Sequence, residues 1–241
     1  MKVKRYLWPW LIATELLLGS CRDRLFDNPF DPGAGEAVFE VVSTILSPAA
    51  DPRGLAFDGA TLWNVDGASN ELLSLNRLSG ALVRSLPSPA DGTEAAAYDG
   101  QDLWVCGPGT VFLHRLNILN GEVLKSLNLQ RGAFTALAWA QGALWAADAQ
   151  SNQVLGVDAE TGEVTGSFAN PGLRADGLAF DGRDFWLADS STLSIYRLGA
   201  DGAVLRVFLS PGQAPRGLAF DGTYLWNADG SGKIYQLSIP R

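Results

Sequence analysis

The sequence predicts an all-β protein, a five-bladed β-propeller with four antiparallel strands in each blade. Three observations predict it. A motif related to GLAFDGxxLW occurs five times, and its tryptophans follow one another at 41, 41, 41 and 40 residues. A glycine in a later turn recurs at 41, 41 and 40 residues. Each repeat holds four short strands separated by turn residues, which is typical of propeller blades. The tryptophans are Trp63, Trp104, Trp145, Trp186 and Trp226, and the glycines are Gly80, Gly121, Gly162 and Gly202.

The first repeat illustrates the four strands and the turns between them. The expected strands are GLAF (54–57), TLWNV (61–65), ELLSLN (71–76) and ALVRSL (81–86). The pairs Asp58-Gly59, Asp66-Gly67 and Ser79-Gly80 separate them. Asp, Ser and Gly favour tight turns because Gly adopts positive φ without strain and short polar side chains bond to the turn backbone. Each repeat is therefore expected to form one antiparallel sheet.

The first strand of each repeat has one small face and one bulky face. In the first repeat Gly54 and Ala56 alternate with Leu55 and Phe57, and the other repeats are similar. Such alternation indicates a strand. The innermost strand of a blade lies where the blade is narrowest, so we expect the small face to allow close approach and the bulky face to fill the space between blades.

The two ends of the chain are expected to close the ring together. The fifth repeat ends after its third strand, KIYQLSI, and lacks a fourth. Upstream of the first repeat, residues 38–46 (VFEVVSTIL) form a β-branched strand without a repeat of its own. Pairing this strand with the fifth repeat would complete the last blade and cover its open edge. The propeller is therefore predicted to span residues 38–241.

The N-terminus is predicted to direct the protein to the bacterial envelope. Residues 1–20 have a basic start and an apolar stretch too short to span a bilayer, as in a signal peptide. The following Leu18-Gly19-Ser20-Cys21 resembles the bacterial lipobox, which implies a lipid on Cys21. Residues 21–37 are expected to be the lipidated cysteine and a flexible tether. An ordinary signal peptide followed by a chance cysteine is the alternative, and Glu15 within the apolar stretch favours it.

This interpretation places the protein outside the cytoplasm, anchored to a bacterial membrane through Cys21. Arg22 follows the cysteine, and by resemblance to Gram-negative lipoproteins the absence of Asp there favours the outer membrane. The processed chain would have 15 basic and 25 acidic residues, a net charge of −10. Such a charge repels phosphate backbones, so nucleic acid is not an expected partner. A monomer is predicted, with an envelope protein or a peptide as the possible partner.

Few residues of this chain can bind metals or form disulfides. It has two cysteines and one histidine, which excludes a disulfide scaffold and a site built from several His or Cys ligands. We therefore predict no cofactor and no metal. His114 lies within an expected strand and is assigned a local structural role. Cys106 is interpreted as a small buried residue, with a reactive thiol as the alternative.

The residue before each GLAF-like core is polar and varies between repeats. In a propeller these positions meet around one end of the central channel, which we call the mouth. Two arginines and two carboxylates there could bind a zwitterionic or peptide-like ligand through charge-assisted hydrogen bonds. A network of ion pairs that satisfies itself and closes the channel is the alternative. The candidate binding residues are Arg53, Glu94, Thr135, Asp176 and Arg216.

A second ring of residues lies three positions after each tryptophan. Four of its members are aspartates, which could suggest a cation site. We favour a structural role, in which each Asp bonds to its own turn, because Ca²⁺ needs carboxylates that converge at short range. The repeated tryptophans are likewise interpreted as packing between blades and not as a stacking surface. The ring consists of Asp66, Gly107, Asp148, Asp189 and Asp229.

The repeat, with its DG turns and LW strand, resembles the plant and bacterial glutamine cyclotransferase family of five-bladed propellers over about residues 38–239. It also resembles, more weakly, NHL-type and streptogramin-lyase-type propellers. The resemblance implies that Glu94, in TEAAAYDG, could transfer protons while an N-terminal glutamine cyclises. The chain departs from the family at Arg53, where the family has Gln. It also has Thr135 and Cys106-Gly107 where the family has channel aromatics.

The function expected from the sequence is binding. We predict an envelope lipoprotein whose propeller recognises a ligand or a protein through its polar mouth. The alternative is a glutaminyl-peptide cyclotransferase that forms N-terminal pyroglutamate with Glu94 as general acid and base.

Overall fold

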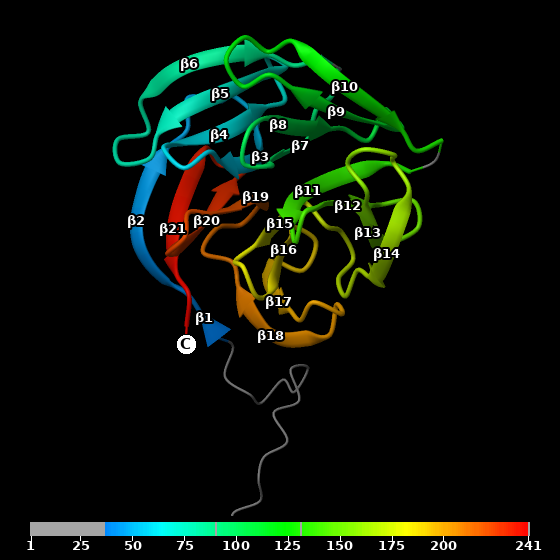
Figure 1. Cartoon of the computed structure of the whole chain (residues 1–241). Coiled ribbons are helices and arrows are strands. Elements are labelled where there is room, and N and C mark those ends of the chain that lie inside the picture. Colours follow the sequence, from blue (N-terminus) through cyan, green and yellow to red (C-terminus); the bar gives the residue numbers. More distant parts are fainter. Residues whose placement is uncertain (1–36, 90, 131, 241) are drawn as a thin grey trace, which may run out of the picture.

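Five small β-sheets are arranged around a central axis in the computed structural model, which describes residues 37–89, 91–130 and 132–240 (Figure 1). Each sheet is one blade, and the predicted five-bladed propeller is confirmed. The described residues form strands and no helices, so none of them builds a helical membrane span. The predicted signal peptide (1–20), the lipidation site Cys21 and the tether up to residue 36 lie outside the described residues.

The blades follow one another along the chain. The first contains β3 (Pro52–Phe57), β4 (Thr61–Asp66), β5 (Glu71–Asn76) and β6 (Leu82–Pro87). The second contains β7 (Ala95–Tyr98), β8 (Leu103–Cys106), β9 (Phe112–Leu116) and β10 (Val123–Asn128). The third contains β11 (Phe134–Ala140), β12 (Ala143–Asp148), β13 (Gln153–Val157) and β14 (Val164–Ala169).

The last two blades share the N-terminal strands. The fourth contains β15 (Gly177–Phe180), β16 (Phe185–Asp189), β17 (Ser194–Leu198), β18 (Val204–Leu209) and β1 (Ala37–Val38). The fifth contains β19 (Pro215–Phe220), β20 (Tyr224–Asp229), β21 (Lys233–Ser238) and β2 (Glu40–Leu46). Within each blade, strands that follow one another in the sequence pair antiparallel.

The N-terminal strand closes the ring as predicted. β2 pairs antiparallel with β21, so the first part of the propeller supplies the outer strand of the last blade. The structure adds a feature that the sequence pattern did not predict. The expected strand is interrupted at the buried Phe39, whose ring stacks on Phe208 at 4.4 Å between centroids. On the other side of Phe39, β1 pairs parallel with β18, and the segment therefore joins the last two blades.

The first strands approach one another closely around the channel, as their small faces predict. The Gly54 backbone N–H donates to the Glu94 carbonyl of the next blade at 2.8 Å. A Cβ atom at position 54 would lie 2.6 Å from the Ala95 Cα, so only glycine fits this contact. The bulky faces pack between blades, for example Leu55 and Phe57 in one cluster with Trp226. Burying large apolar side chains stabilises the fold by roughly 1.5–3 kcal/mol for each.

An aspartate organises the first turn of four blades. Asp58 Oδ1 accepts hydrogen bonds from the backbone N–H groups of Ala60 and Thr61, and Oδ2 accepts from the Trp63 indole at 2.8 Å. The same indole contact recurs in the other three blades of this set. It explains why the Asp-Gly pair and the tryptophan repeat together, since one carboxylate serves both. The predicted role of the tryptophans in packing is confirmed.

The third blade departs from this pattern. Ala140 occupies the position of the aspartate, and Gln141-Gly142 form a tight hairpin in which both residues have positive φ. Trp145 stacks near Phe168, and its indole nitrogen is buried without a hydrogen-bond partner among the described residues. A missing carboxylate thus leaves one polar donor unsatisfied.

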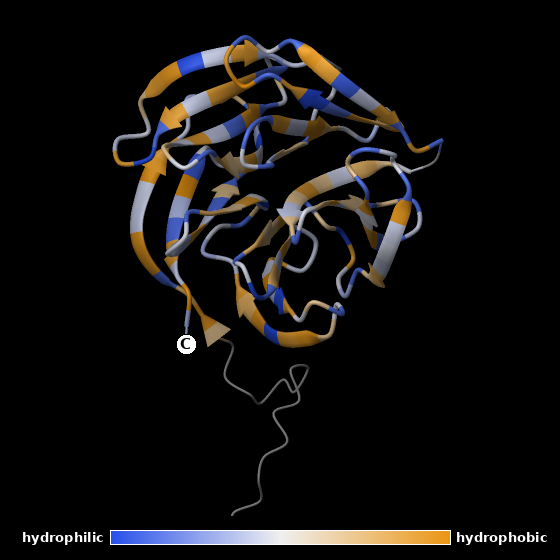
Figure 2. Cartoon of the chain, in the orientation of Figure 1, coloured by the Kyte–Doolittle hydropathy of each residue, from blue (hydrophilic) through white to orange (hydrophobic). Residues whose placement is uncertain are grey.

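The outermost strands run along the perimeter and carry both polar and apolar side chains (Figure 2). Val83, Leu124 and Leu205 are among the exposed apolar residues on these strands. The main core lies inside this perimeter, between the blades.

Candidate functional site

All five sequence-predicted residues of the mouth line one cavity of about 150 Å³. Arg53, Thr135 and Arg216 lie near the starts of β3, β11 and β19, while Glu94 and Asp176 immediately precede β7 and β15. Because every first strand begins at the same end of the channel, one side chain from each blade reaches the mouth. Among the described residues, the lining consists of Arg53, Glu94, Thr135, Arg174, Asp176, Ser190, Ala214 and Arg216.

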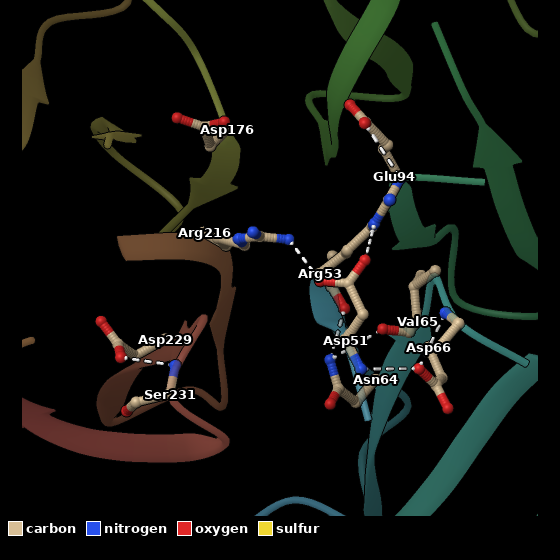
Figure 3. A network of polar contacts seen from close by, with 12 residues as sticks. Asp51, Arg53, Asn64, Val65, Asp66, Glu94, Asp176, Arg216, Asp229 and Ser231 are labelled. Carbon is tan, nitrogen blue, oxygen red and sulfur yellow. Dashed lines mark hydrogen bonds and ion pairs between the residues drawn. The ribbon is translucent and has the colours of Figure 1, made fainter. Parts of the chain in front are cut away.

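A chain of ion pairs connects three blades across this mouth (Figure 3). Asp51 accepts from Arg216 Nη1 at 2.8 Å through one oxygen and from Arg53 Nε at 2.9 Å through the other. Arg53 Nη1 also donates to Glu94 Oε1 at 2.9 Å. Asp51 therefore links the fifth blade to the first, and Arg53 links the first to the second. Charge-assisted hydrogen bonds of this kind fix the orientation of the guanidinium groups.

Glu94 is largely buried in the mouth, with its side chain 17% exposed. Burial raises the pKa of its carboxyl above the ordinary value. The positive charges nearby, that of Arg53 first among them, offset only part of this rise. Within the described residues, Oε1 accepts the bond from Arg53 and no group donates to Oε2. Glu94 can therefore accept another hydrogen bond and can hold a proton more readily than an exposed glutamate.

A second ion pair lies on the fourth blade. Arg174 Nε donates to Asp176 Oδ1 at 2.5 Å, and the backbone N–H of Ser190 donates to Oδ2 at 2.9 Å. Asp176 is consequently fixed by both of its oxygens. Thr135 is also held, because its hydroxyl donates to the Ala175 carbonyl at 2.6 Å. The structure thus supports part of the ion-pair alternative considered from the sequence, since the carboxylates are largely satisfied within the protein.

Sequence reasoning missed four residues of this mouth network, and a signal for two of them was present. Asp51 stands two positions before Arg53, and Arg174 stands two positions before Asp176. Residues two positions apart in an extended segment point to the same side. Charged residues at this spacing could therefore have been assigned to the mouth. Ala214 has the same spacing before Arg216 but carries no charge, and Ser190 comes from a turn that shows no such pattern.

The aspartates of the second ring accept hydrogen bonds from the loops around the mouth, as the structural interpretation predicts. Asp66 Oδ1 accepts from the Ala68 N–H in its own turn and from the Asp51 N–H in the preceding loop. Asp148, Asp189 and Asp229 make equivalent bonds. Burial raises the pKa of Asp66, but these hydrogen bonds lower it by more, so it lies below the ordinary value. In the described part of the chain, no three His, Cys or acidic groups converge in a way that could hold a metal ion.

Cys106 and His114 are not among the residues that line the mouth, although the Cys106 carbonyl accepts the Glu94 backbone N–H at 2.9 Å. The Cys106 thiol is fully buried, with Sγ 3.6 Å from the Phe134 carbonyl oxygen, and burial raises its pKa well above the ordinary value. It is a core residue, as the favoured interpretation states. His114 lies in β9, where Nδ1 contacts Ser126 Oγ at 2.8 Å and the ring stacks on Phe112. Neither residue can supply the mouth with a nucleophile or base.

A second, smaller cavity of about 80 Å³ lies between the five first strands. Its lining includes the aromatic residue near the end of each of these strands. These residues are Phe57, Tyr98, Trp139, Phe180 and Phe220. Charged groups thus line one end of the channel and aromatic groups the other.

Comparison with known proteins agrees with the fold. No family model matches the chain. No curated protein matches it either. Among solved structures, the glutaminyl cyclase of Myxococcus xanthus is 13% identical, with a TM-score of 0.71, over 85% of this chain and 98% of that one.

Two further structures are similar over a smaller share of their length. An inactive variant of virginiamycin B lyase from Staphylococcus aureus is 20% identical, with a TM-score of 0.52, over 80% of this chain and 68% of that one. The WD40 propeller domain of Doa1 is 12% identical, with a TM-score of 0.55, over 78% and 63%. At these identities the likeness concerns the fold. The chain is thus a five-bladed β-propeller similar in fold to the Myxococcus xanthus glutaminyl cyclase, as its repeats predict.

Proposed function

We propose that this protein is a binding module of the bacterial envelope that recognises a ligand at the mouth of its propeller. One observation carries the proposal: three arginines and three carboxylates from four blades converge at a cavity of about 150 Å³. Scaffolding alone does not require charged side chains from four blades at one end of the channel, since apolar and aromatic side chains line the other cavity. A cavity with a few convergent polar groups is the usual form of a ligand site.

Anchoring through Cys21 belongs to the same proposal. A lipid on Cys21 and the tether after it would hold the propeller at a bacterial membrane. Cys21→Ser should then move the protein from the membrane fraction to the soluble fraction, as measured by immunoblotting after fractionation. Cys106→Ser is the matched control, because this cysteine is in the core and should not change the distribution. Equal membrane retention of both variants would exclude the lipid anchor.

Binding is tested with the detergent-solubilised full-length protein. Isothermal titration calorimetry with a set of short peptides of differing charge should detect at least one that binds. Arg53→Ala and Arg216→Ala should each weaken that binding about tenfold or more, since charge-assisted hydrogen bonds contribute about 1.5–3 kcal/mol. Arg183→Ala is the control, because this side chain is 84% exposed and lies in a turn away from the mouth. Binding that survives both mouth substitutions would place recognition elsewhere.

A second candidate function is glutaminyl-peptide cyclisation. Two observations favour it: the fold resembles a glutaminyl cyclase, and burial raises the pKa of Glu94 at the mouth. In this reaction the N-terminal amine of a peptide attacks the side-chain carboxamide carbon of its glutamine. The C–N bond to the amide nitrogen breaks, ammonia leaves and a lactam forms. Glu94 would take the proton from the amine and return it to the leaving nitrogen.

The lining of the mouth favours binding over this reaction. As far as the structure describes it, this lining includes no aromatic residue, so little would hold a glutaminyl side chain against Glu94. The enzyme is tested by incubating the protein with Gln-initiated peptides and following the loss of ammonia by mass spectrometry. Turnover that disappears in Glu94→Gln but persists in Glu122→Gln, an exposed control, would establish the enzyme. No turnover at high protein concentration would exclude it.

A further inference from the structure

The carboxylates and the arginines of the mouth differ strongly in how many further hydrogen bonds they can make. Five of the six oxygens of Asp51, Glu94 and Asp176 already accept a hydrogen bond from the protein. Glu94 Oε2 is the exception among the described contacts. The carboxylates of the mouth can therefore accept few hydrogen bonds from a ligand.

The arginines, in contrast, keep most of their donors. Each guanidinium group has five N–H bonds. Among the described residues, Arg216 uses only Nη1 and Arg174 only Nε in ion pairs. Their side chains are 34% and 52% exposed, respectively, and both line the same cavity as the Ser190 hydroxyl. The unused groups of the mouth are thus mainly donors with positive charge.

We infer that the mouth recognises a carboxylate, held between Arg174 and Arg216, and this inference rests on the proposed binding function. A planar carboxylate matches the fork of a guanidinium group and can satisfy two of its N–H bonds at once. Among the described residues, Glu94 Oε2 is the one carboxylate oxygen of the mouth that accepts no hydrogen bond, so we assign it an N–H of the same ligand. The paired carboxylates of the protein keep the arginines in place before the ligand arrives.

The size of the cavity limits which part of a ligand enters. The cavity has a volume of about 150 Å³ and is bounded by side chains of the mouth. An end group with a carboxylate fits this space, whereas a folded protein segment does not. Two sources share this chemistry: the C-terminus of a peptide, whose body stays outside, and a small free carboxylic acid that enters completely.

Calorimetry with four probes tests the inference on the detergent-solubilised full-length protein. They are N-acetyl-trialanine with a free carboxylate, trialanine amide with a free amine, unmodified trialanine, and succinate. The two peptides with a carboxylate should bind at least about tenfold more tightly than the amide. Succinate binding as tightly as the peptides would identify a free acid as the source, and succinate binding more weakly would identify a peptide terminus.

Variants connect this preference to the two arginines. Arg174→Ala and Arg216→Ala should each weaken carboxylate binding about tenfold, while Arg183→Ala should not change it. Arg216→Lys keeps the charge but loses the fork, so it should bind with intermediate affinity, and its thermal unfolding reports whether the fold is intact. Amide binding that equals or exceeds acid binding would overturn the inference and leave the proposed function standing. If none of the four probes binds, both are overturned.

Discussion

A single carboxylate performs two tasks in the first turn of four blades. The Asp58 carboxylate receives two backbone N–H groups of its turn and the indole N–H of Trp63. Trp145 shows the effect of replacing the aspartate, since its indole nitrogen is buried without a partner in the described structure. An unsatisfied buried donor costs about 1–3 kcal/mol.

Asp58→Ala should therefore destabilise the protein by about 2 kcal/mol, because it leaves both the turn and the indole without an acceptor. For a domain of this size that corresponds to a decrease in Tm of roughly 4–8 °C, measured by differential scanning calorimetry. Asp201→Ala is the control, since this exposed aspartate bonds only to the Ala203 N–H of its own turn. Equal decreases in the two variants would show that the indole contact contributes nothing.

The approach between neighbouring first strands is an element-scale feature with its own test. A Cβ atom on Gly54 would lie 2.7 Å from the Glu94 carbonyl oxygen and 2.8 Å from the Ala96 nitrogen, both backbone atoms. Gly54→Ala should force β3 and β7 apart and cost about 1–3 kcal/mol, as overpacking usually does. Urea unfolding measures this loss. Gly109→Ala has open space around it and should unfold at nearly the same urea concentration as the unsubstituted protein.

The segment that closes the ring makes a second element-scale prediction. Phe39 is 8% exposed and packs on Phe208 and Trp186, where β1 and β2 separate. Phe39→Ala should cost about 3 kcal/mol, as a buried aromatic usually does. The last blade should also become more sensitive to limited proteolysis, because β2 loses its attachment. Val38→Ala, at a side chain 67% exposed, should change neither measurement. Matching losses in the two variants would show that the packing of Phe39 on Phe208 and Trp186 does not stabilise the last blade.

Across the whole molecule, the repeated carboxylates make the stability of the fold depend on pH in the acidic range. Burial raises the pKa values of Asp58, Asp66 and Asp148, but hydrogen bonds from backbone and side chains lower them by more. A carboxyl whose pKa is lower in the folded state contributes stability at pH values above its unfolded pKa of about 4. That contribution decreases as the pH falls through the folded pKa. Glu94 acts in the opposite direction: burial raises its pKa, so its ionisation lowers the stability of the folded state as the pH rises.

The Tm should therefore stay nearly constant from pH 7 to about pH 5 and fall steeply below about pH 4. The Asp66→Asn/Asp148→Asn double variant should be less stable at neutral pH and lose less on acidification, since two of the titrating groups are gone. Glu122→Gln is the control and should follow the unsubstituted protein. A double variant with the same acid dependence as the unsubstituted protein would contradict this origin.

Much of the architecture could be predicted from the sequence, because the repeats give the same information several times. Five tryptophans and four turn glycines each report the same period, and the missing fourth strand of the last repeat points to residues 38–46. The mouth residues follow from their position before each first strand. The partners Asp51 and Arg174 were missed although each stands two positions before a mouth residue, and only the bond between Asp51 and Arg216 depends on how two blades meet. The break at Phe39 was missed because strand propensity continues through it.

The strand that closes the ring also determines when the ring can form. Ser43 in β2 donates to Gln236 in β21, a contact between residues 193 positions apart. Residue 43 leaves the ribosome long before residue 236, so β2 cannot form its antiparallel pairing until β21 has been synthesised. Contacts of such long sequence separation form slowly because a large loop must close first. We therefore expect the ring to close only after β21 has left the ribosome, so that the blades made earlier remain without their closing contact until then.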